Sequence, residues 1–149
     1  MANNYQLFSA IVPNLSAQER DWANRVLSCQ QNVKKRLLGN GIKPCAIEAD
    51  DWPGFQWEWI HEDHDLWLYA EEYGNIGHVG EFVRAFLARF RPSNCWALTW
   101  AQTCSRPRIG EFSGGGLFVT AKSLRAFTAL DAVSRMRRRF ERKARSCPG

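Results

Sequence analysis

The chain has 149 residues, of which 45% are hydrophobic and 13% aromatic, and a formal net charge of +5. This length is typical of one domain, and the hydrophobic content excludes a disordered chain. No segment approaches the roughly 20 apolar residues that span a bilayer, and the start lacks the pattern of a secretory signal. The five cysteines include no C-x-x-C pair, which argues against a disulfide framework or a zinc ribbon. We expect a single cytoplasmic domain over residues 1–149, with free thiols and no membrane contact.

Charge is divided sharply along the chain. No Lys or Arg occurs from Pro44 to Val83, yet this stretch holds ten of the fifteen acidic residues. The densest basic run, Arg135 to Arg145, holds seven Lys or Arg residues, opposed only by Glu141. This asymmetry predicts two separate surfaces of opposite charge.

The first predicted element is a helix. Ser16 and Glu19 have the spacing of a capping box, in which each side chain accepts the other residue's backbone N–H. Gly39 to Gly41 supplies residues that end a helix. The apolar residues between these signals fall on one stripe: Trp22, Val26, Cys29, Val33 and Leu37.

The second predicted element is a hairpin. Phe55 to Trp59 alternates aromatic and polar residues, which is typical of a strand. His61 to Asp65 forms a polar turn, and Leu66 to Glu71 is expected to be the returning strand. The sequence therefore predicts an acidic hairpin rich in tryptophan.

Three further elements follow. Apolar residues from Val79 to Phe90 have helical spacing, and Pro92 ends that helix. Cys95 to Ala101 alternates like a strand, and Glu111 to Ala121 is a final strand. Ser123 is expected to cap the last helix, whose apolar positions would be Leu124, Phe127, Leu130 and Val133.

The order αββαββα predicts the fold class. Two hairpins around a central amphipathic helix indicate an α+β fold with a mainly antiparallel sheet of about four strands. Three helices would cover one face of this sheet. A basic C-terminal helix or tail is expected over about residues 123–149.

Residue types that carry chemistry occur, but in patterns more typical of structure. His61 to Asp65 contains metal-ligating residue types, yet a hairpin turn is polar in any case, so we predict no metal site. Cys104 with His78 could form a nucleophilic pair, and Glu58 with Glu71 a carboxylate pair. Buried cysteines and exposed strand carboxylates are the commoner outcome. We therefore expect neither an enzyme nor a cofactor.

The glycine-rich segment Gly110 to Gly116 leaves two interpretations open. Glycine N–H groups could cradle phosphate, but a strand follows where phosphate-binding motifs need a helix. A bulge, or a ring packed against Gly114 to Gly116, is the simpler explanation. The residues around this turn that would form a local site are Trp100, Arg106, Arg108 and Glu111.

The basic run indicates contact with nucleic acid. A basic helix is the electrostatic footprint of such proteins, and arginine suits bidentate contact with phosphate. The alternative is a solvated terminal helix. The predicted nucleic-acid-binding residues are Arg106, Arg108, Arg135, Arg137, Arg138, Arg139, Arg142, Lys143 and Arg145.

The acidic hairpin indicates contact with a protein. Tryptophan beside carboxylates suits protein recognition, because Trp is a frequent hot-spot residue. The alternative is that the acids only offset the charge of the basic helices. The predicted partner-binding residues are Trp57, Glu58, Trp59, Glu62, Asp63, Asp65, Glu71 and Glu72.

Several runs of the sequence resemble a known family. They are Ala70 to Leu87, Phe90 to Pro92, Leu98 to Ser105 and Arg108 to Gly116. The segment from about Phe55 to Lys122 resembles uncharacterised small proteins encoded among accessory genes of bacterial plasmids and phages. The resemblance implies a mobile-element context, and with it an inhibitor of host defence such as an anti-CRISPR protein. It assigns no catalytic residues.

Three functions remain in order of preference. The first is a non-enzymatic binding or inhibitor protein that occludes a host protein, such as a nucleic-acid-handling defence complex, through the acidic hairpin. The second is an accessory protein that binds nucleic acid directly through the arginine-rich helix. The third is a small hydrolase centred on the loop from Cys104 to Gly116. A homodimer held by the opposite charges is also open.

Overall fold

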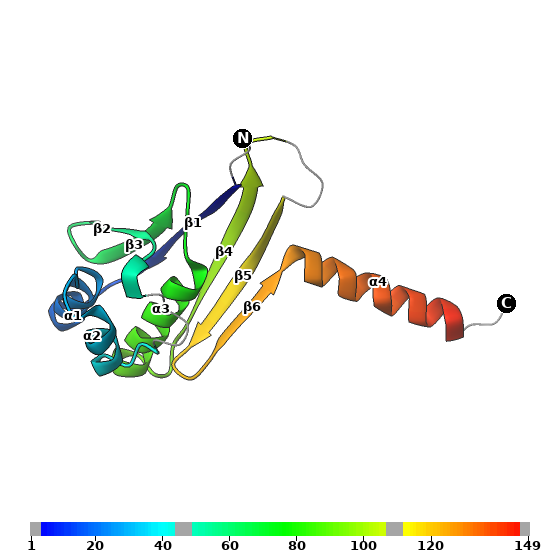
Figure 1. Cartoon of the computed structure of the whole chain (residues 1–149). Helices are drawn as coiled ribbons and strands as arrows, with labels where there is room; N and C mark the ends of the chain where they lie inside the picture. Colours follow the sequence, from blue (N-terminus) through cyan, green and yellow to red (C-terminus); the bar gives the residue numbers. More distant parts are fainter. Residues whose placement is uncertain (1–3, 44–48, 107–111, 147–149) are drawn as a thin grey trace.

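A computed structural model of the chain describes residues 4–43, 49–106 and 112–146. Four α-helices and one six-stranded antiparallel sheet occupy these residues, with the strand order β2-β3-β1-β4-β5-β6 (Figure 1). The strands are β1 (Asn4–Val12), β2 (Gln56–Ile60), β3 (Asp65–Ala70), β4 (Cys95–Cys104), β5 (Ser113–Thr120) and β6 (Leu124–Thr128). The helices are α1 (Ala17–Leu27), α2 (Val33–Gly39), α3 (Ile76–Phe90) and α4 (Ala129–Ser146), with a 3-10 turn η2 (Ala49–Asp51).

The α+β class and the antiparallel sheet are confirmed, but the predicted four strands and three helices are too few. The strand β1 was not predicted, and it lies at the centre of the sheet. Phe8 pairs with Ala70 of β3 on one side and with Trp100 of β4 on the other. The two predicted hairpins are therefore not neighbours, because β1 separates them.

The capping box of the first helix is confirmed. Ser16 N donates to Glu19 Oε2 at 2.8 Å, and Glu19 N donates to Ser16 Oγ at 3.3 Å. The single long helix that the apolar stripe predicted is instead two helices, α1 and α2. Asn32 precedes α2 with φ of 50°, and asparagine is one of the residues that tolerates this left-handed conformation.

The last helix begins later than predicted. Ser123 does not cap it, because the Ser123 hydroxyl lies 2.9 Å from Thr120 Oγ1 in the turn between β5 and β6. Leu124 to Thr128 forms the strand β6, and Thr128 Oγ1 accepts from Asp131 N at 3.1 Å at the start of α4. Thr128 is thus the capping residue.

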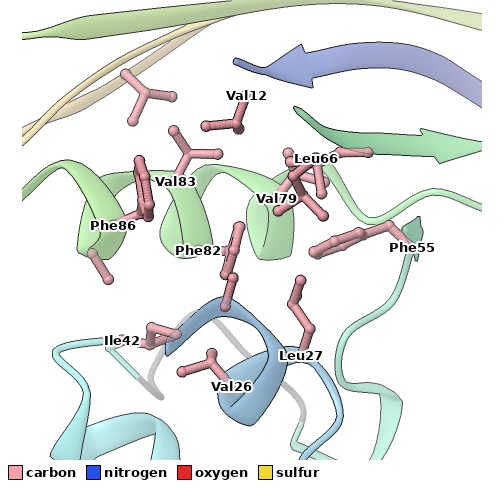
Figure 2. Close-up of a cluster of buried hydrophobic side chains, with 14 of the residues drawn as sticks. Val12, Val26, Leu27, Ile42, Phe55, Leu66, Val79, Phe82, Val83 and Phe86 are labelled. Carbon is pink, nitrogen blue, oxygen red and sulfur yellow. The ribbon is translucent and has the colours of Figure 1, made fainter. Parts of the chain in front are cut away.

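The core lies between one face of the sheet and the helices α1 to α3. On β3, Leu66, Leu68 and Ala70 are buried, whereas Trp67 and Tyr69 on the other face are partly exposed. Figure 2 shows the apolar side chains of α3 between those of the sheet and those of α1. The expectation that helices cover one face of the sheet holds for α1 to α3 (Figure 1).

The opposite side, which we call the open face, is covered by no helix among the described residues. The strand registers place the side chains of alternate residues on it. Charged residues sit near its two edges, with Glu58 on β2 and Arg125 on β6. The apolar and small residues between them are Leu7, Ile11, Trp67, Tyr69, Ala97, Thr99, Ala101, Phe118 and Phe127.

The glycines of β5 are structural, as the simpler interpretation predicted. A Cβ on Gly115 would lie 2.7 Å from the Trp100 ring and 2.2 Å from the Phe127 carbonyl oxygen. A Cβ on Gly116 would lie 2.4 Å from the Phe127 ring. Only glycine therefore lets these rings pack against β5 from both faces.

Helix α4 projects from the edge of the sheet (Figure 1). None of its 18 residues is buried. Neither α4 nor any other helix in the described part of the chain combines the length and apolar composition needed to cross a membrane.

Candidate functional site

The turn between β2 and β3, which we call the acidic turn (residues 61–65), has a strained backbone. His61, Glu62 and Asp63 have φ of 51°, 57° and 64°. Residues other than glycine pay a steric cost in this left-handed region, and three in succession are rare. Such strain persists only where surrounding contacts hold the backbone, and it is often found at functional sites.

The connection between β1 and α1 supplies those contacts. Asn14 N donates to Asp65 Oδ1 at 2.8 Å, and Leu15 N donates to the carbonyl of His64 at 2.7 Å. Both bonds join segments about fifty residues apart in the sequence. These two hydrogen bonds therefore attach the last two residues of the acidic turn to the segment between β1 and α1.

Hydrogen bonds stabilise the charged form of Asp65 in the acidic turn. The pKa of Asp65 lies below its ordinary value of 3.8, first because Asn14 N–H bonds the carboxylate and second because His61 does so at 2.7 Å. Glu62 and Asp63 are exposed. Arg20 donates to the backbone carbonyl of Asp63 at 2.9 Å, and this bond orients the turn. It leaves the side-chain carboxylate of Asp63 unpaired with Arg20.

Replacement of Glu62 by glycine tests whether the turn is strained. We expect Glu62→Gly to raise the free energy of unfolding by about 1 kcal/mol, because glycine adopts a φ near 57° without the Cβ penalty. Glu72→Gly is the control, since Glu72 is exposed and has no positive φ; it should lower stability slightly. Urea denaturation measures both. A loss of stability in Glu62→Gly would show that the side chain supports the turn.

The eight predicted partner-binding residues do not share one surface. Trp57 and Trp59 pair with Leu68 and Leu66 and face the helices, where both pack against the core. The Trp59 indole also donates to Asn24 Oδ1 of α1 at 2.9 Å. These two tryptophans therefore stabilise the fold and are turned away from the open face.

The carboxylates are more exposed than the tryptophans. Glu58 lies on the open face, and Glu62 and Asp63 lie in the acidic turn with Asp65. Glu71 and Glu72 follow β3 at the opposite end of the hairpin. The acids therefore lie at the two ends of the hairpin, with Glu58 on β2 between them.

Two residues that the sequence analysis did not select, Trp67 and Tyr69, form the aromatic part of the hairpin's exposed side. Their rings stack with centroids 4.0 Å apart and planes 21° apart. Trp67 donates to Ser9 Oγ at 2.9 Å, and Tyr69 donates to Glu58 Oε1 at 3.1 Å. Side chains along a strand point to alternate faces of the sheet. This rule could have placed Trp67 and Tyr69 on the face of β3 that Leu66 does not occupy.

The phenol of Tyr69 is held in its neutral form. Desolvation raises the pKa of Tyr69 above 10.0, and the hydrogen bond and charge of Glu58 and the charge of Glu71 raise it further. Tyr69 therefore acts as a donor toward Glu58 at neutral pH.

Arginines on α4 lie mainly on one side of the helix. At 3.6 residues per turn, spacings of three, four, seven and ten residues return to the same side. This basic face of α4 consists of Arg135, Arg138, Arg139, Arg142 and Arg145, all exposed. Arg137 instead pairs with Glu141 at 3.2 Å, and Lys143 also lies outside the basic face.

The remaining predicted sites give little support to catalysis. Cys104 ends β4 and His78 lies in the first turn of α3, as the sequence suggested. His78 is fully buried, with Nδ1 3.0 Å from the Pro53 carbonyl oxygen and its ring 5.5 Å from Trp52. These contacts are those of a core histidine.

Glu58 and Glu71, the possible carboxylate pair, are not directly opposite each other in the hairpin. The register places Glu58 opposite Trp67, four residues before Glu71. Among the described residues, no group of three or more His, Cys, Asp or Glu side chains could hold a metal ion. Arg106 is exposed after β4, while Arg108 and Glu111 lie outside the described residues.

A hollow of about 800 Å³ lies between the start of β1, the turn η2 and the connection from β3 to α3. Its lining combines two tyrosine rings with amide side chains and one carboxylate. The sequence did not predict it. The residues include Tyr5, Gln6, Asp51, Tyr73, Asn75 and Gln102.

Comparisons of the chain with protein-family models, with curated proteins and with solved structures return no match.

Proposed function

We propose that this chain is a non-enzymatic binding protein that inhibits its target by covering a basic surface. The observation that carries the proposal is the acidic turn, in which the carboxylates of Glu62 and Asp63 are exposed on a strained backbone that other segments hold in place. Ordering a loop before binding lowers the entropy cost of association. A rigid acidic turn is thus prepared for a partner of opposite charge.

The partner that fits is a protein that handles nucleic acid. Such proteins carry basic grooves for phosphate, and carboxylates of Glu62, Asp63 and Asp65 would stand where phosphates otherwise lie. The proposed context is an inhibitor of host defence, such as an anti-CRISPR protein, encoded by a mobile element. That context comes from the sequence resemblance over about residues 55–122.

Capture of a host protein from a nuclease-treated bacterial lysate tests this function. The double variant Glu62→Lys, Asp63→Lys should lose the captured protein, because the attraction becomes repulsion. Asp50→Lys, Asp51→Lys is the matched control, since it makes the same change of charge at another exposed acidic pair. Capture that survives in the first variant, or that fails equally in both, would contradict the proposal.

Direct binding of nucleic acid is the second candidate, favoured by the basic face of α4. Five exposed arginines on one side of a projecting helix could track a phosphate backbone. If the captured material disappears with nuclease treatment, this candidate replaces the first. The slope of log affinity against log salt would then count the phosphates contacted.

A further inference from the structure

Helix α4 carries an apolar stripe with no partner in the described part of the chain. Ala129, Val133, Met136 and Phe140 follow alternating spacings of four and three residues, with Leu130 beside them. Leu130, Val133, Met136 and Phe140 are 70%, 62%, 69% and 74% exposed. The basic face lies on the other side of the helix. An amphipathic helix of this kind normally buries its apolar side.

The chain cannot cover this stripe with its own sheet. Thr128, the last residue of β6, is followed at once by Ala129, the first residue of α4. No loop is present to reverse the direction, and the helix runs outward past the β6 edge (Figure 1). The partner of the apolar stripe must therefore come from another molecule.

The open face is a second apolar surface, and no helix in the described part of the chain covers it. Phe118 and Phe127 are 44% and 50% exposed on it, and Ile11 is 40% exposed. Between them the side chains of Ala97 and Thr99 are small, so the surface is shallow where these strands cross it. A helix can approach a sheet closely over such a surface.

We propose that these two surfaces cover each other between two copies of the chain. The apolar stripe of α4 in one copy packs on the open face of the second copy, and the second copy's α4 does the same in return. The β6 edges of the two sheets lie next to each other at the twofold axis. This arrangement is isologous, as expected for a symmetric dimer, and it also shields the unpaired edge of β6.

The dimensions of the two surfaces match. Helix α4 has 18 residues, which at about 1.5 Å per residue gives a length of about 27 Å. Six strands about 4.8 Å apart make a sheet about 24 Å wide. Because α4 starts at its own β6, one strand spacing before the β6 of the second copy, its end reaches about β3 there. Phe140, the last residue of the apolar stripe, lies about 17 Å along the helix and therefore over β4 or β1.

A basic side chain at the margin of the apolar stripe matches the acid on the open face. Lys143 lies seven residues after Met136 and therefore on the same side of α4. In the second half of the helix it would extend toward Glu58 of the second copy, which carries the opposite charge. The acidic turn and most of the basic face remain accessible in the dimer. The dimer can therefore form whether or not the proposed function is correct.

Light scattering after gel filtration of the full chain tests the dimer. The wild-type protein should have twice the chain mass of 17.1 kDa. Val133→Glu, Met136→Glu should be monomeric and still folded, because no residue of α4 is buried. Arg135→Glu, Arg138→Glu places two glutamates on the other side of the helix and should remain dimeric.

The open face needs its own variant. Phe118→Glu should weaken dimerisation at least about tenfold, whereas Lys122→Glu, in the neighbouring turn, should not. A monomeric wild-type protein at high concentration would overturn the proposal. So would a dimer lost in the α4 variant but retained in Phe118→Glu, because that result means pairing of α4 with α4. Binding of the monomer to anionic vesicles through α4 would assign the stripe to a membrane surface.

Discussion

Replacement of Trp22 by alanine is expected to lower the free energy of unfolding by about 3–5 kcal/mol. Trp22 is 1% exposed, and its ring lies 5.6 Å from Phe82, 6.1 Å from Phe86 and 5.7 Å from Phe90. Its indole N–H donates to Asn40 Oδ1 at 2.9 Å, which ties α1 to the end of α2. Alanine leaves a cavity among three rings and removes this bond. Denaturant unfolding followed by circular dichroism measures the loss.

Trp67→Ala is the matched control for this prediction. Trp67 lies on the open face, where it stacks with Tyr69 and bonds Ser9. Losing these contacts should cost about 1 kcal/mol. Equal costs for the two tryptophans would mean that the helices do not form the principal core.

Replacement of Arg91 by alanine is expected to cost about 3 kcal/mol, because it leaves a mostly buried carboxylate unpaired. Arg91 donates to both carboxylate oxygens of Glu19, at 3.0 and 2.9 Å. It also donates to the carbonyls of Pro13 and Asn14, at 2.9 and 2.7 Å. One side chain therefore joins the end of α3, the start of α1 and the end of β1. Arg89→Ala, at the same helix end but exposed, should cost less than about 1 kcal/mol.

The same pair predicts a dependence on pH. Burial alone raises the pKa of Glu19, but the bonds from Arg91 and from Ser16 and the charge of Arg91 outweigh it, so the pKa lies below 4.5. A carboxyl with a lowered pKa stabilises the fold above the unfolded pKa of about 4.3, and this stabilisation is lost as pH falls through the folded value. Glu19→Gln should therefore be less stable than wild type at pH 7, with a difference that shrinks below about pH 4.5. A constant difference down to pH 3 would contradict this.

The sequence predicted the elements whose signals are local. The capping box of Ser16 and Glu19, the alternation from Phe55 to Trp59 and the helical spacing from Val79 to Phe90 each reflect contacts within one element. Those elements are present. The antiparallel hairpin followed from the polar turn between its strands.

The strands β1 and β6 were missed because their local patterns do not indicate a strand, and only contacts with distant segments define them. In β1, Leu7 and Ile11 are apolar on the open face while Phe8 and Val12 are apolar on the covered face. The alternation that marks a strand is therefore absent. Period-two signals fail where both faces of a strand are apolar.

The strand β6 was mistaken for the start of a helix because, over only five residues, the spacing of its apolar side chains also fits a helix. Leu124 and Phe127 are three positions apart, which suits one side of a helix. In the strand they face opposite sides, Leu124 toward Gly80 of α3 and Phe127 across Gly116 of β5. The predicted partner-binding residues divide between two faces for a related reason. Trp57 and Trp59 face the helices, whereas Glu58, between them on β2, lies on the open face, and composition alone does not separate them.

The central position of β1 has a consequence for the order of folding. The strand β1 pairs with β3, in register Phe8 to Ala70, and with β4, in register Asn4 to Cys104. Both partners therefore lie about fifty residues or more after β1 in the chain. The sheet closes only after two long loops have been ordered, which raises the contact order and slows folding. Until then, β1 with its two apolar sides is the segment that most needs protection from aggregation.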